Sequence, residues 1–427
     1  MLRTADLNYD LPAELIATTP ADPRDSARLL VVSRSDPSRL EHRVVLDLPA
    51  ILRPPSLLPG HPRDLMVVNA TRVLPARFRG VRPDTGGHAE GLYVGPATLP
   101  VSPASAPDQA NAPGPFWSVL LKMRRLKPGV TVVLLDHQGQ RSNVRLRLIE
   151  RAGGHAPDNP DTGGWIVAVE STAEPLDSTT TASDLLNRIG LTPVPPYILS
   201  ARKKSQLEIA DERDRSTYQT VYASAAGERP GFGSVAAPTA GLHFTPALLD
   251  RLQTAGVDRA EVTLDVGLGT YKPVETEFVE QHPMHSEWCG VPRETALAIQ
   301  RMRARSVGDE PRDARTSHHL PAPRLIAVGT TAARTLESFA SVQDMLTTGT
   351  HDTRLLITPA YRFKHVDALL TNFHLPGTTL LAMVAAMLAR PDEAQSVAID
   401  RLKRIYSEAV RERYRFFSFG DAMLILP

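Results

Sequence analysis

Short apolar runs separated by turn residues dominate the chain from residue 74 to residue 169. They occur at residues 117–121, 130–136, 144–149 and 165–169, and each has the length and the β-branched or aromatic content of one strand. No helix-length periodicity interrupts this block. The pattern therefore predicts a small antiparallel β-barrel.

A different rhythm starts after residue 183, where segments typical of buried strands alternate with segments typical of helices. The expected strands, one of which precedes the barrel block, are residues 64–69, 260–266, 324–328 and 366–371, and the expected helices are residues 185–189, 379–388 and 398–414. The predicted fold class is α/β. A large discontinuous α/β domain, residues 1–73 plus 184–427, carries an inserted small antiparallel β-barrel domain, residues 74–183.

Composition narrows the class of protein. Hydrophobic residues make up 42% and charged residues 22% of the 427 positions, which is ordinary for a globular chain. The N-terminus does not resemble a signal peptide, and the longest apolar stretch, near residues 380–389, is shorter than the roughly 20 residues of a membrane helix. The single cysteine, Cys289, fits a reducing compartment. We therefore expect a cytoplasmic protein without a membrane segment.

Charge is almost balanced, at +1, so any contact with RNA must come from local basic clusters. Two such clusters could bind phosphates: Lys122, Arg124, Arg125 and Lys127 in the barrel block, and Arg202, Lys203 and Lys204 in a loop. Basic residues of the last helix are partly balanced by glutamates and indicate a solvated face. Stretches rich in proline or polar residues at 96–115, 152–164 and 307–323 are interpreted as surface insertions.

Four segments combine polar residues and glycines in ways that core packing does not require. In Ala-Pro-Thr-Ala-Gly-Leu-His-Phe, residues 237–244, Thr239 offers a hydroxyl and His243 an imidazole that titrates near neutrality. His243 is either a structural or a catalytic histidine. In the segment 282–287, His285 and Glu287 are interpreted as hydrogen-bonding or acid–base groups, because the proline between the histidines spoils a metal-ligand face.

The third segment, residues 262–270, places Asp265 before Gly267 and Gly269 at a strand end. Such a turn is similar to the S-adenosylmethionine-binding turn of Rossmann-like methyltransferases, although a third glycine is missing and Pro273 opposes a following helix. In the fourth segment a strand leads through Thr330 and Thr331 into a helix. Free amides at that helix N-terminus could accept a carboxylate or phosphate, and ordinary threonine capping is the alternative.

Ordered motif blocks extend along almost the whole chain. They lie at residues 9–17, 23–31, 69–77, 195–198, 218–222, 237–244, 284–287, 328–331, 371–377 and 414–423. Together they closely resemble the S-adenosylmethionine:tRNA ribosyltransferase-isomerases of queuosine biosynthesis. The resemblance implies an α/β domain plus a small barrel, and a reaction that transfers and isomerises the ribosyl part of S-adenosylmethionine onto 7-aminomethyl-7-deazaguanine at the tRNA wobble position. Epoxyqueuosine would form, and adenine and methionine would leave.

The resemblance and the reaction that it implies point to two groups of candidate site residues. The catalytic candidates are His243, His285, Glu287, Asp265 and His374. The substrate-binding candidates are Asn69, Thr71, Arg72, Thr239, Gly267, Gly269, Thr330, Thr331, Arg334 and Asn372. A positioned base would remove the acidic C5′ proton beside the sulfonium, and an acid would protonate the leaving adenine. We expect S-adenosylmethionine as a co-substrate, no prosthetic group and no metal, tRNA as the macromolecular partner, and a monomer.

Two positions depart from the family pattern. Asp265 stands where the family usually has histidine, and Ala70 where it commonly has aspartate. If the usual histidine is an essential base, Asp265 must replace it with a carboxylate of lower intrinsic pKa. Two alternatives therefore accompany the main hypothesis: an S-adenosylmethionine-dependent methyltransferase, and a tRNA-binding paralogue whose catalysis is impaired.

Overall fold

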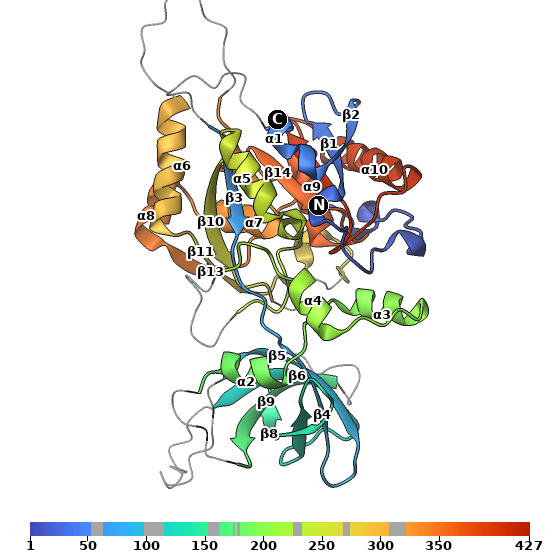
Figure 1. The fold of residues 1–427 in the computed structure, drawn as a ribbon. Helices are drawn as coiled ribbons and strands as arrows, with labels where there is room; N and C mark the ends of the chain where they lie inside the picture. The colour runs from blue at the N-terminus through green and yellow to red at the C-terminus, as the bar shows by residue number, and fades with distance from the viewer. Residues whose placement is uncertain are drawn as a thin grey trace, which may run out of the picture.

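The computed structural model describes residues 1–52, 63–97, 115–152, 162–173, 176, 180–224, 233–267, 274–306 and 322–427. Most of the three expected insertions, and Gly269, lie outside the described residues. A larger α/β part and a smaller β part lie one above the other in Figure 1, and the chain enters and leaves the smaller part on the side that faces the larger one. The predicted α/β class is confirmed.

The larger part is built on a mixed sheet whose nine described strands follow the order β13-β11-β10-β3-β12-β14-β15-β1-β2. Their bounds are β1 Arg28–Ser33, β2 Leu40–Val44, β3 Leu65–Asn69, β10 Asp258–Leu264, β11 Glu287–Gly290, β12 Leu325–Val328, β13 Thr350–Thr353, β14 Ala368–Asn372 and β15 Ala422–Leu426. Strands β10, β3, β12 and β14 are parallel neighbours, so their carboxyl ends meet at one edge of the sheet. We call this the carboxyl edge.

Both faces of these central strands are buried, which explains their continuous apolar sequences. In β3, Leu65 and Val67 contribute to the hydrophobic core on one face, whereas Met66 and Val68 contribute to the core on the other. Helices α7, α9 and α10 cover the first face, and α1 and α5 the second. The helices are α1 Leu48–Ile51, α2 Ala182–Ile189, α3 Pro196–Lys204, α4 Asp211–Thr217, α5 Pro246–Thr254, α6 Arg293–Ser306, α7 Thr330–Glu337, α8 Val342–Thr348, α9 Thr379–Leu388 and α10 Gln395–Arg411.

The smaller part is a closed ring of antiparallel strands in the order β4-β5-β6-β9-β8-β7, which β4 and β7 complete by pairing with each other. The strands are β4 Arg77–Val81, β5 His88–Ala97, β6 Phe116–Lys122, β7 Thr131–Leu135, β8 Arg141–Arg151 and β9 Thr162–Ser171. Closure removes the free edges that an open sheet would expose. Trp117 and Trp165 belong to its core, and so do Leu185 and Leu186 of α2. The expected boundary at residue 184 therefore falls inside a helix that packs on the barrel.

The strands and helices expected from sequence are confirmed in place, with ends that differ by up to three residues. Two linkers join the parts, residues 70–76 and 190–195, and they approach each other closely. A Cβ added to Gly190 would lie 1.8 Å from the carbonyl oxygen of Pro75, so only glycine fits there. Within the described ranges, no helix combines the length and apolar character needed to cross a bilayer.

Candidate functional site

A small cavity of about 60 Å³ opens at the carboxyl edge, beside the turns that follow β12 and β14. Its walls include Tyr197, Thr239, Thr331, Asn372, His374 and Leu380. We call it the first cavity. Ligands of open α/β sheets bind in crevices outside the carboxyl ends of the strands, so its position is the one expected for a small-molecule site. The sheet brings together residues that are more than 100 positions apart in sequence.

His374 lies directly after β14 and lines the first cavity. Its Nε2 is 2.8 Å from the Thr371 hydroxyl, its backbone N–H donates to the Tyr406 hydroxyl at 3.1 Å, and the Tyr9 hydroxyl donates to its carbonyl at 2.5 Å. Burial lowers the pKa of His374 to about 4. The imidazole is therefore neutral at physiological pH and held in one place, as a general base requires.

His243 does not line the cavity but lies behind Asn372. The Asn372 Nδ2 donates to His243 Nε2 at 3.3 Å and to the Phe417 carbonyl at 3.1 Å, and its Oδ1 accepts from the Thr239 hydroxyl at 2.9 Å. Burial, followed by the charges of Arg415 and Arg24, lowers the pKa of His243 to about 3. A neutral His243 thus accepts a hydrogen bond from Asn372 and fixes the orientation of the Asn372 side-chain amide in the cavity wall.

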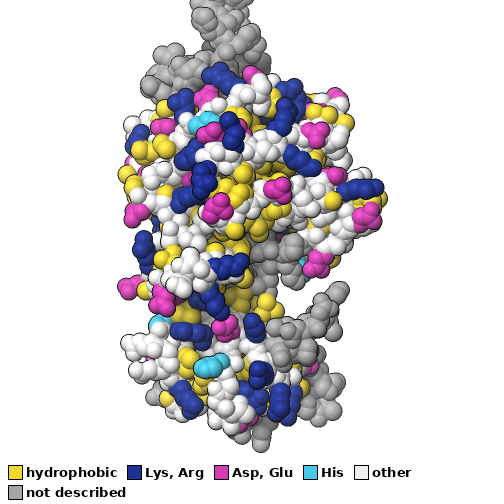
Figure 2. Space-filling model, turned by 90° about the vertical axis from the view of Figure 1, so that its right-hand side faces the viewer, with side chains coloured by type: hydrophobic (Ala, Val, Ile, Leu, Met, Phe, Trp, Pro, Cys, Tyr) yellow, Lys and Arg dark blue, Asp and Glu magenta, His cyan; other side chains and the backbone are white. Residues whose placement is uncertain are grey.

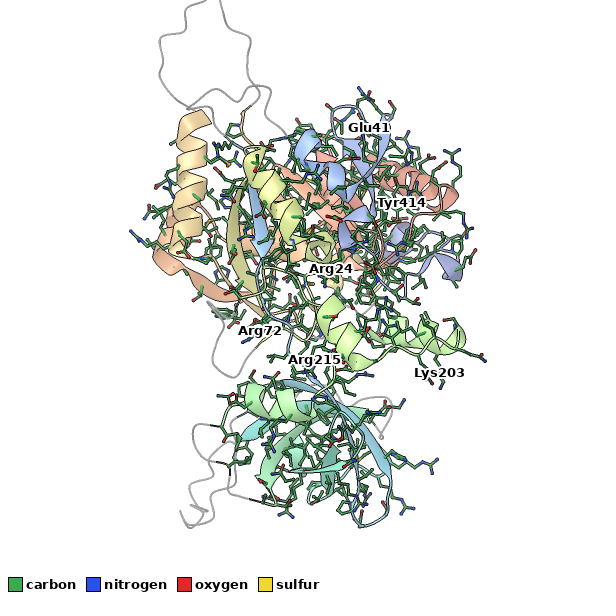
Figure 3. The ribbon with its side chains drawn as sticks, viewed as in Figure 1. Arg24, Glu41, Arg72, Lys203, Arg215 and Tyr414 are labelled. Carbon is green, nitrogen blue, oxygen red and sulfur yellow. The ribbon has the colours of Figure 1, made fainter. Side chains whose placement is uncertain are left out.

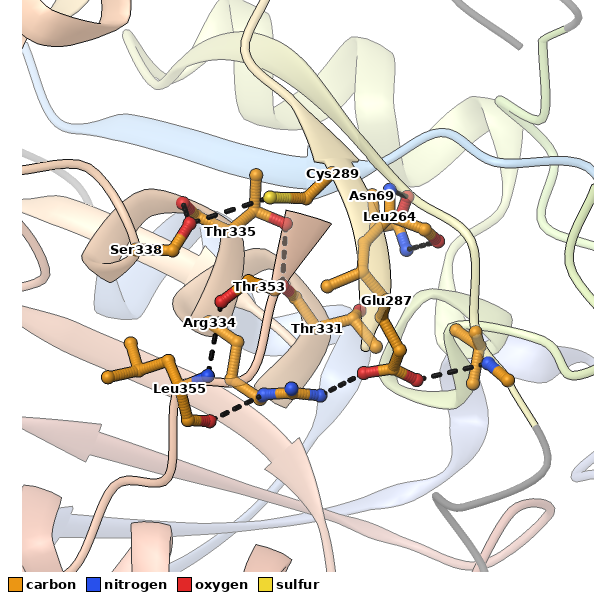
Figure 4. A network of polar contacts seen from close by, with 12 residues as sticks. Asn69, Leu264, Glu287, Cys289, Thr331, Arg334, Thr335, Ser338, Thr353 and Leu355 are labelled. Atoms are coloured by element: carbon orange, nitrogen blue, oxygen red, sulfur yellow. Dashed lines mark hydrogen bonds and ion pairs between the residues drawn. The ribbon is translucent and has the colours of Figure 1, made fainter. Parts of the chain in front are cut away.

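A second cavity, of about 30 Å³, lies beside the first, and Leu380 forms part of the wall of both. His285, Glu287 and Arg334 supply its polar side. Glu287 and Arg334 form a buried ion pair, and the other carboxylate oxygen of Glu287 accepts from the Gly267 N–H at 3.0 Å (Figure 4). His285 is exposed at this cavity. Glu287 therefore holds a turn and a cation in place.

Asn69, Thr71 and Asp265 form a third polar group where β3 and β10 end. The Asn69 Oδ1 accepts from the N–H groups of Leu264 and Thr71, both at 3.1 Å, and its Nδ2 donates to the Leu264 carbonyl at 3.1 Å. The Thr71 hydroxyl donates to Asp265 Oδ1 at 3.2 Å. Asn69 links the ends of β3 and β10, and neither Asn69 nor Asp265 is among the described residues that line either cavity. The substrate-binding role of Asn69 stays a prediction.

Beyond Gly267, the described residues 274–286 do not form the helix that follows a methyltransferase turn. A Rossmann-like turn leads from a strand into a helix, whereas β10 pairs with the antiparallel strand β11, and the described residues between them include only the short 3₁₀ helix Val279–Gln281. The methyltransferase alternative thereby loses the feature that suggested it. Gly267 serves instead as the donor to Glu287.

At the other turn, Gly329 adopts a φ of 88°, which favours glycine, and α7 begins directly after it without a side-chain cap. Thr330 and Thr331 are buried in the wall of the first cavity. Within the described residues the Thr331 hydroxyl has no hydrogen-bond partner. The N-terminus of α7 therefore has the uncapped form that an anion site needs, and the binding of an anion there stays a prediction.

The basic residues fall into two groups. Lys122, Arg124, Arg125 and Lys127 are exposed around the end of β6, and Lys203 and Lys204 are exposed at the end of α3. Arg202 is a correction to the prediction, because it is buried and its guanidinium makes bonds of 2.6 and 2.8 Å to both carboxylate oxygens of Asp214. It joins α3 to α4 and is not available to a phosphate. Arg72 is exposed, and Figure 3 shows it on the side of the larger part that faces the barrel.

The described residues on the face drawn in Figure 2 show no single basic patch. On the face drawn in Figure 2, lysine and arginine side chains occur over both parts of the molecule and are interspersed with acidic ones. Across the described residues, no three histidine, cysteine, aspartate or glutamate side chains gather closely enough to hold a metal ion.

Sequence reasoning missed the loop before β15. Tyr197 and Ser418 line the first cavity, and their hydroxyls are hydrogen-bonded. Phe417 adopts a φ of 73°, a left-handed conformation that is unfavourable for a bulky residue, and its carbonyl accepts from Asn372. The motif at 414–423 contained the signal, but its phenylalanines and serine suggest no acid–base chemistry.

Comparison with known proteins assigns the chain. The family model described as queuosine biosynthesis protein matches residues 4–425. A protein of Symbiobacterium thermophilum named S-adenosylmethionine:tRNA ribosyltransferase-isomerase is 40% identical over 100% of both chains. One of the same name from Gloeobacter violaceus is 39% identical over 99% of this chain and 96% of its own. A crystal structure of a Thermotoga maritima S-adenosylmethionine tRNA ribosyltransferase is 28% identical, covers 99% of this chain and 100% of its own, and has a TM-score of 0.44. The family match and the identity over the full length agree, and the chain belongs to the queuosine biosynthesis protein family.

Proposed function

We propose that this chain transfers and isomerises the ribosyl part of S-adenosylmethionine onto 7-aminomethyl-7-deazaguanine at the wobble position of tRNA. Epoxyqueuosine forms, and adenine and methionine are released. The observation that carries the proposal is the match to the queuosine biosynthesis family over residues 4–425. The two neighbouring cavities at the carboxyl edge support it, because they supply acid–base groups and amide donors in a partly enclosed space.

The reaction needs a base, an acid and a neutral amine. His374 is the proposed base for the C5′ proton, since its lowered pKa keeps it neutral within the first cavity. His285 is the proposed acid, because its imidazole is exposed at the second cavity, where a substrate can reach it. His243 is assigned a positioning role, which it exerts through Asn372. The attacking aminomethyl group stays neutral where burial disfavours its charged form.

We propose further that the closed ring from Arg77 to Ser171, together with α2, is an inserted domain that contacts the tRNA. Support comes from its own hydrophobic core and from the basic loop that follows β6. The larger domain then comprises residues 1–73 and 192–427. We also propose that the enzyme acts as a cytoplasmic monomer and needs no metal or prosthetic group.

The decisive experiment incubates the protein with S-adenosylmethionine and tRNA that carries the aminomethyl precursor. Nucleoside mass spectrometry should detect epoxyqueuosine, and chromatography should detect adenine and methionine in equal amounts. Folded protein that forms no epoxyqueuosine would refute the proposal. Binding of the same tRNA without adenine release would favour the impaired paralogue, for which Asp265 and Ala70 are the motivating observations.

A further inference from the structure

One guanidinium in the second cavity is incompletely paired. The Arg334 Nε donates to the Leu355 carbonyl at 3.2 Å, and Nη1 is paired with the Glu287 carboxylate (Figure 4). The third nitrogen, Nη2, has no hydrogen-bond partner among the described residues, although the side chain is only 8% exposed. Leaving a buried donor without a partner costs roughly 1–3 kcal/mol, and such groups are rare in native proteins. A bound ligand would explain it.

The surroundings indicate what that ligand is. Arg334 lines the second cavity, and the apolar part of the wall comes from Met284, Leu355, Leu356, Ile357, Leu380 and Met383. A guanidinium presents parallel N–H groups that match a carboxylate, and bonds to a charged acceptor are stronger than neutral ones. Aliphatic and thioether walls suit a short methylene chain. The cavity therefore fits a small aliphatic group that ends in a carboxylate.

We propose that the second cavity binds the amino-acid arm of S-adenosylmethionine, and that its α-carboxylate accepts a hydrogen bond from Arg334 Nη2. The inference rests on the proposed function and adds the orientation of the co-substrate. Leu380 is shared by both cavities, so the sulfur end of the arm lies next to the first cavity. The nucleoside then occupies the first cavity, whose wall offers aromatic rings from Tyr197, Phe373 and Phe417.

Thr331 is the rival anchor, because its unpartnered hydroxyl and the N-terminus of α7 also suit an anion. The two groups lie three residues apart on one helix and open into different cavities. Arg334 is favoured for two reasons. It donates from a charged group, and the cavity beside it has the aliphatic wall that a methylene chain needs, whereas Thr331 lies in the wall suited to a nucleobase.

The test compares the affinities of S-adenosylmethionine and decarboxylated S-adenosylmethionine, measured by calorimetry. Wild-type protein should bind the carboxylate-bearing ligand about 10- to 100-fold more tightly, the range expected for a charge-assisted bond. Arg334→Lys keeps the charge beside Glu287 but loses Nη2, so this preference should fall to under about 3-fold. Thr331→Val, the matched control on the same helix, should keep the preference. Because both ligands are measured on the same variant, partial unfolding lowers both signals alike.

Several results would overturn the inference. Equal affinity of the wild-type protein for both ligands, or no measurable binding of either, would remove the carboxylate subsite, and this measurement does not depend on whether Arg334→Lys folds. If Thr331→Val loses the preference for the carboxylate-bearing ligand and Arg334→Lys keeps it, the carboxylate binds at the N-terminus of α7 and not at Arg334. Epoxyqueuosine formation is assayed separately with wild-type protein, so a failure of the proposed function is distinguished from a failure of the subsite.

Discussion

The carboxyl edge of the large sheet and the interior of the barrel bury opposite kinds of side chain. At the edge, His243, Glu287, Arg334, Asn372 and His374 are all less than 10% exposed. Among the described residues of the barrel strands, no charged or amide side chain is buried, and the core consists of aliphatic and aromatic groups. The same chain thus contains one unit with an apolar interior and another that encloses a polar site.

Burying a polar group is unfavourable unless the group is paired. A cluster of buried polar groups is therefore typical of a functional site, where the chemistry requires it. The edge satisfies most of its polar groups through one another, as in the Thr239–Asn372–His243 chain. The barrel places its charges outside, around the end of β6. We therefore expect substitutions at the edge to change chemistry and pH dependence, and substitutions on the barrel to change tRNA affinity alone.

The largest effect is expected for His374→Gln. Glutamine can still hydrogen-bond to Thr371 but cannot act as a base, so kcat should fall by about 100- to 10,000-fold. The affinity for tRNA should stay within about 2-fold of wild type. Single-turnover formation of epoxyqueuosine and filter binding measure the two quantities. The matched control is His88→Ala, an exposed histidine on β5 of the barrel, which should keep full turnover. A His374→Gln enzyme that turns over normally would remove the base from the first cavity.

The dependence of stability on pH should also separate the two regions. The folded-state pKa values of His243 and His374 are lowered to about 3 and about 4, whereas an unfolded histidine titrates near 6.5. Between pH 6.5 and about 4 the unfolded state binds protons that the folded state does not, so stability falls as the pH falls. Each histidine should contribute a loss of about 2 kcal/mol between pH 7.5 and pH 5.

Urea unfolding at several pH values measures this loss. His374→Gln should reduce the slope of the free energy of unfolding against pH by the contribution of one buried histidine, whereas His88→Ala should leave the slope unchanged. An unchanged slope in His374→Gln would mean that the buried imidazole becomes protonated in the folded state.

The strands at the edge could be predicted because both of their faces are buried, so β3, β12 and β14 appear as continuous apolar runs. His374 became a candidate through the resemblance of the block at residues 371–377, and the structure places it in the wall of the first cavity. The partners of the candidates could not be predicted, because Asn372 meets His243 across 129 positions and Glu287 meets Arg334 across 47. The same limit hid the burial of Arg202, whose partner Asp214 lies on the next helix of the chain.

The smallest expected effect comes from the barrel, where Arg124→Gln combined with Lys127→Gln removes two exposed charges near the end of β6. If both contact phosphates, the tRNA dissociation constant should rise by about 10-fold, and the slope of log affinity against log salt should become shallower by between 1 and 2. kcat at saturating tRNA should not change, because neither residue reaches the carboxyl edge. The comparison variant, Lys203→Gln with Lys204→Gln, removes the same number of charges from α3 of the larger part. An unchanged salt slope in the barrel variant together with a shallower one in the α3 variant would transfer the tRNA contact to the larger part, and the barrel would then have only a structural role.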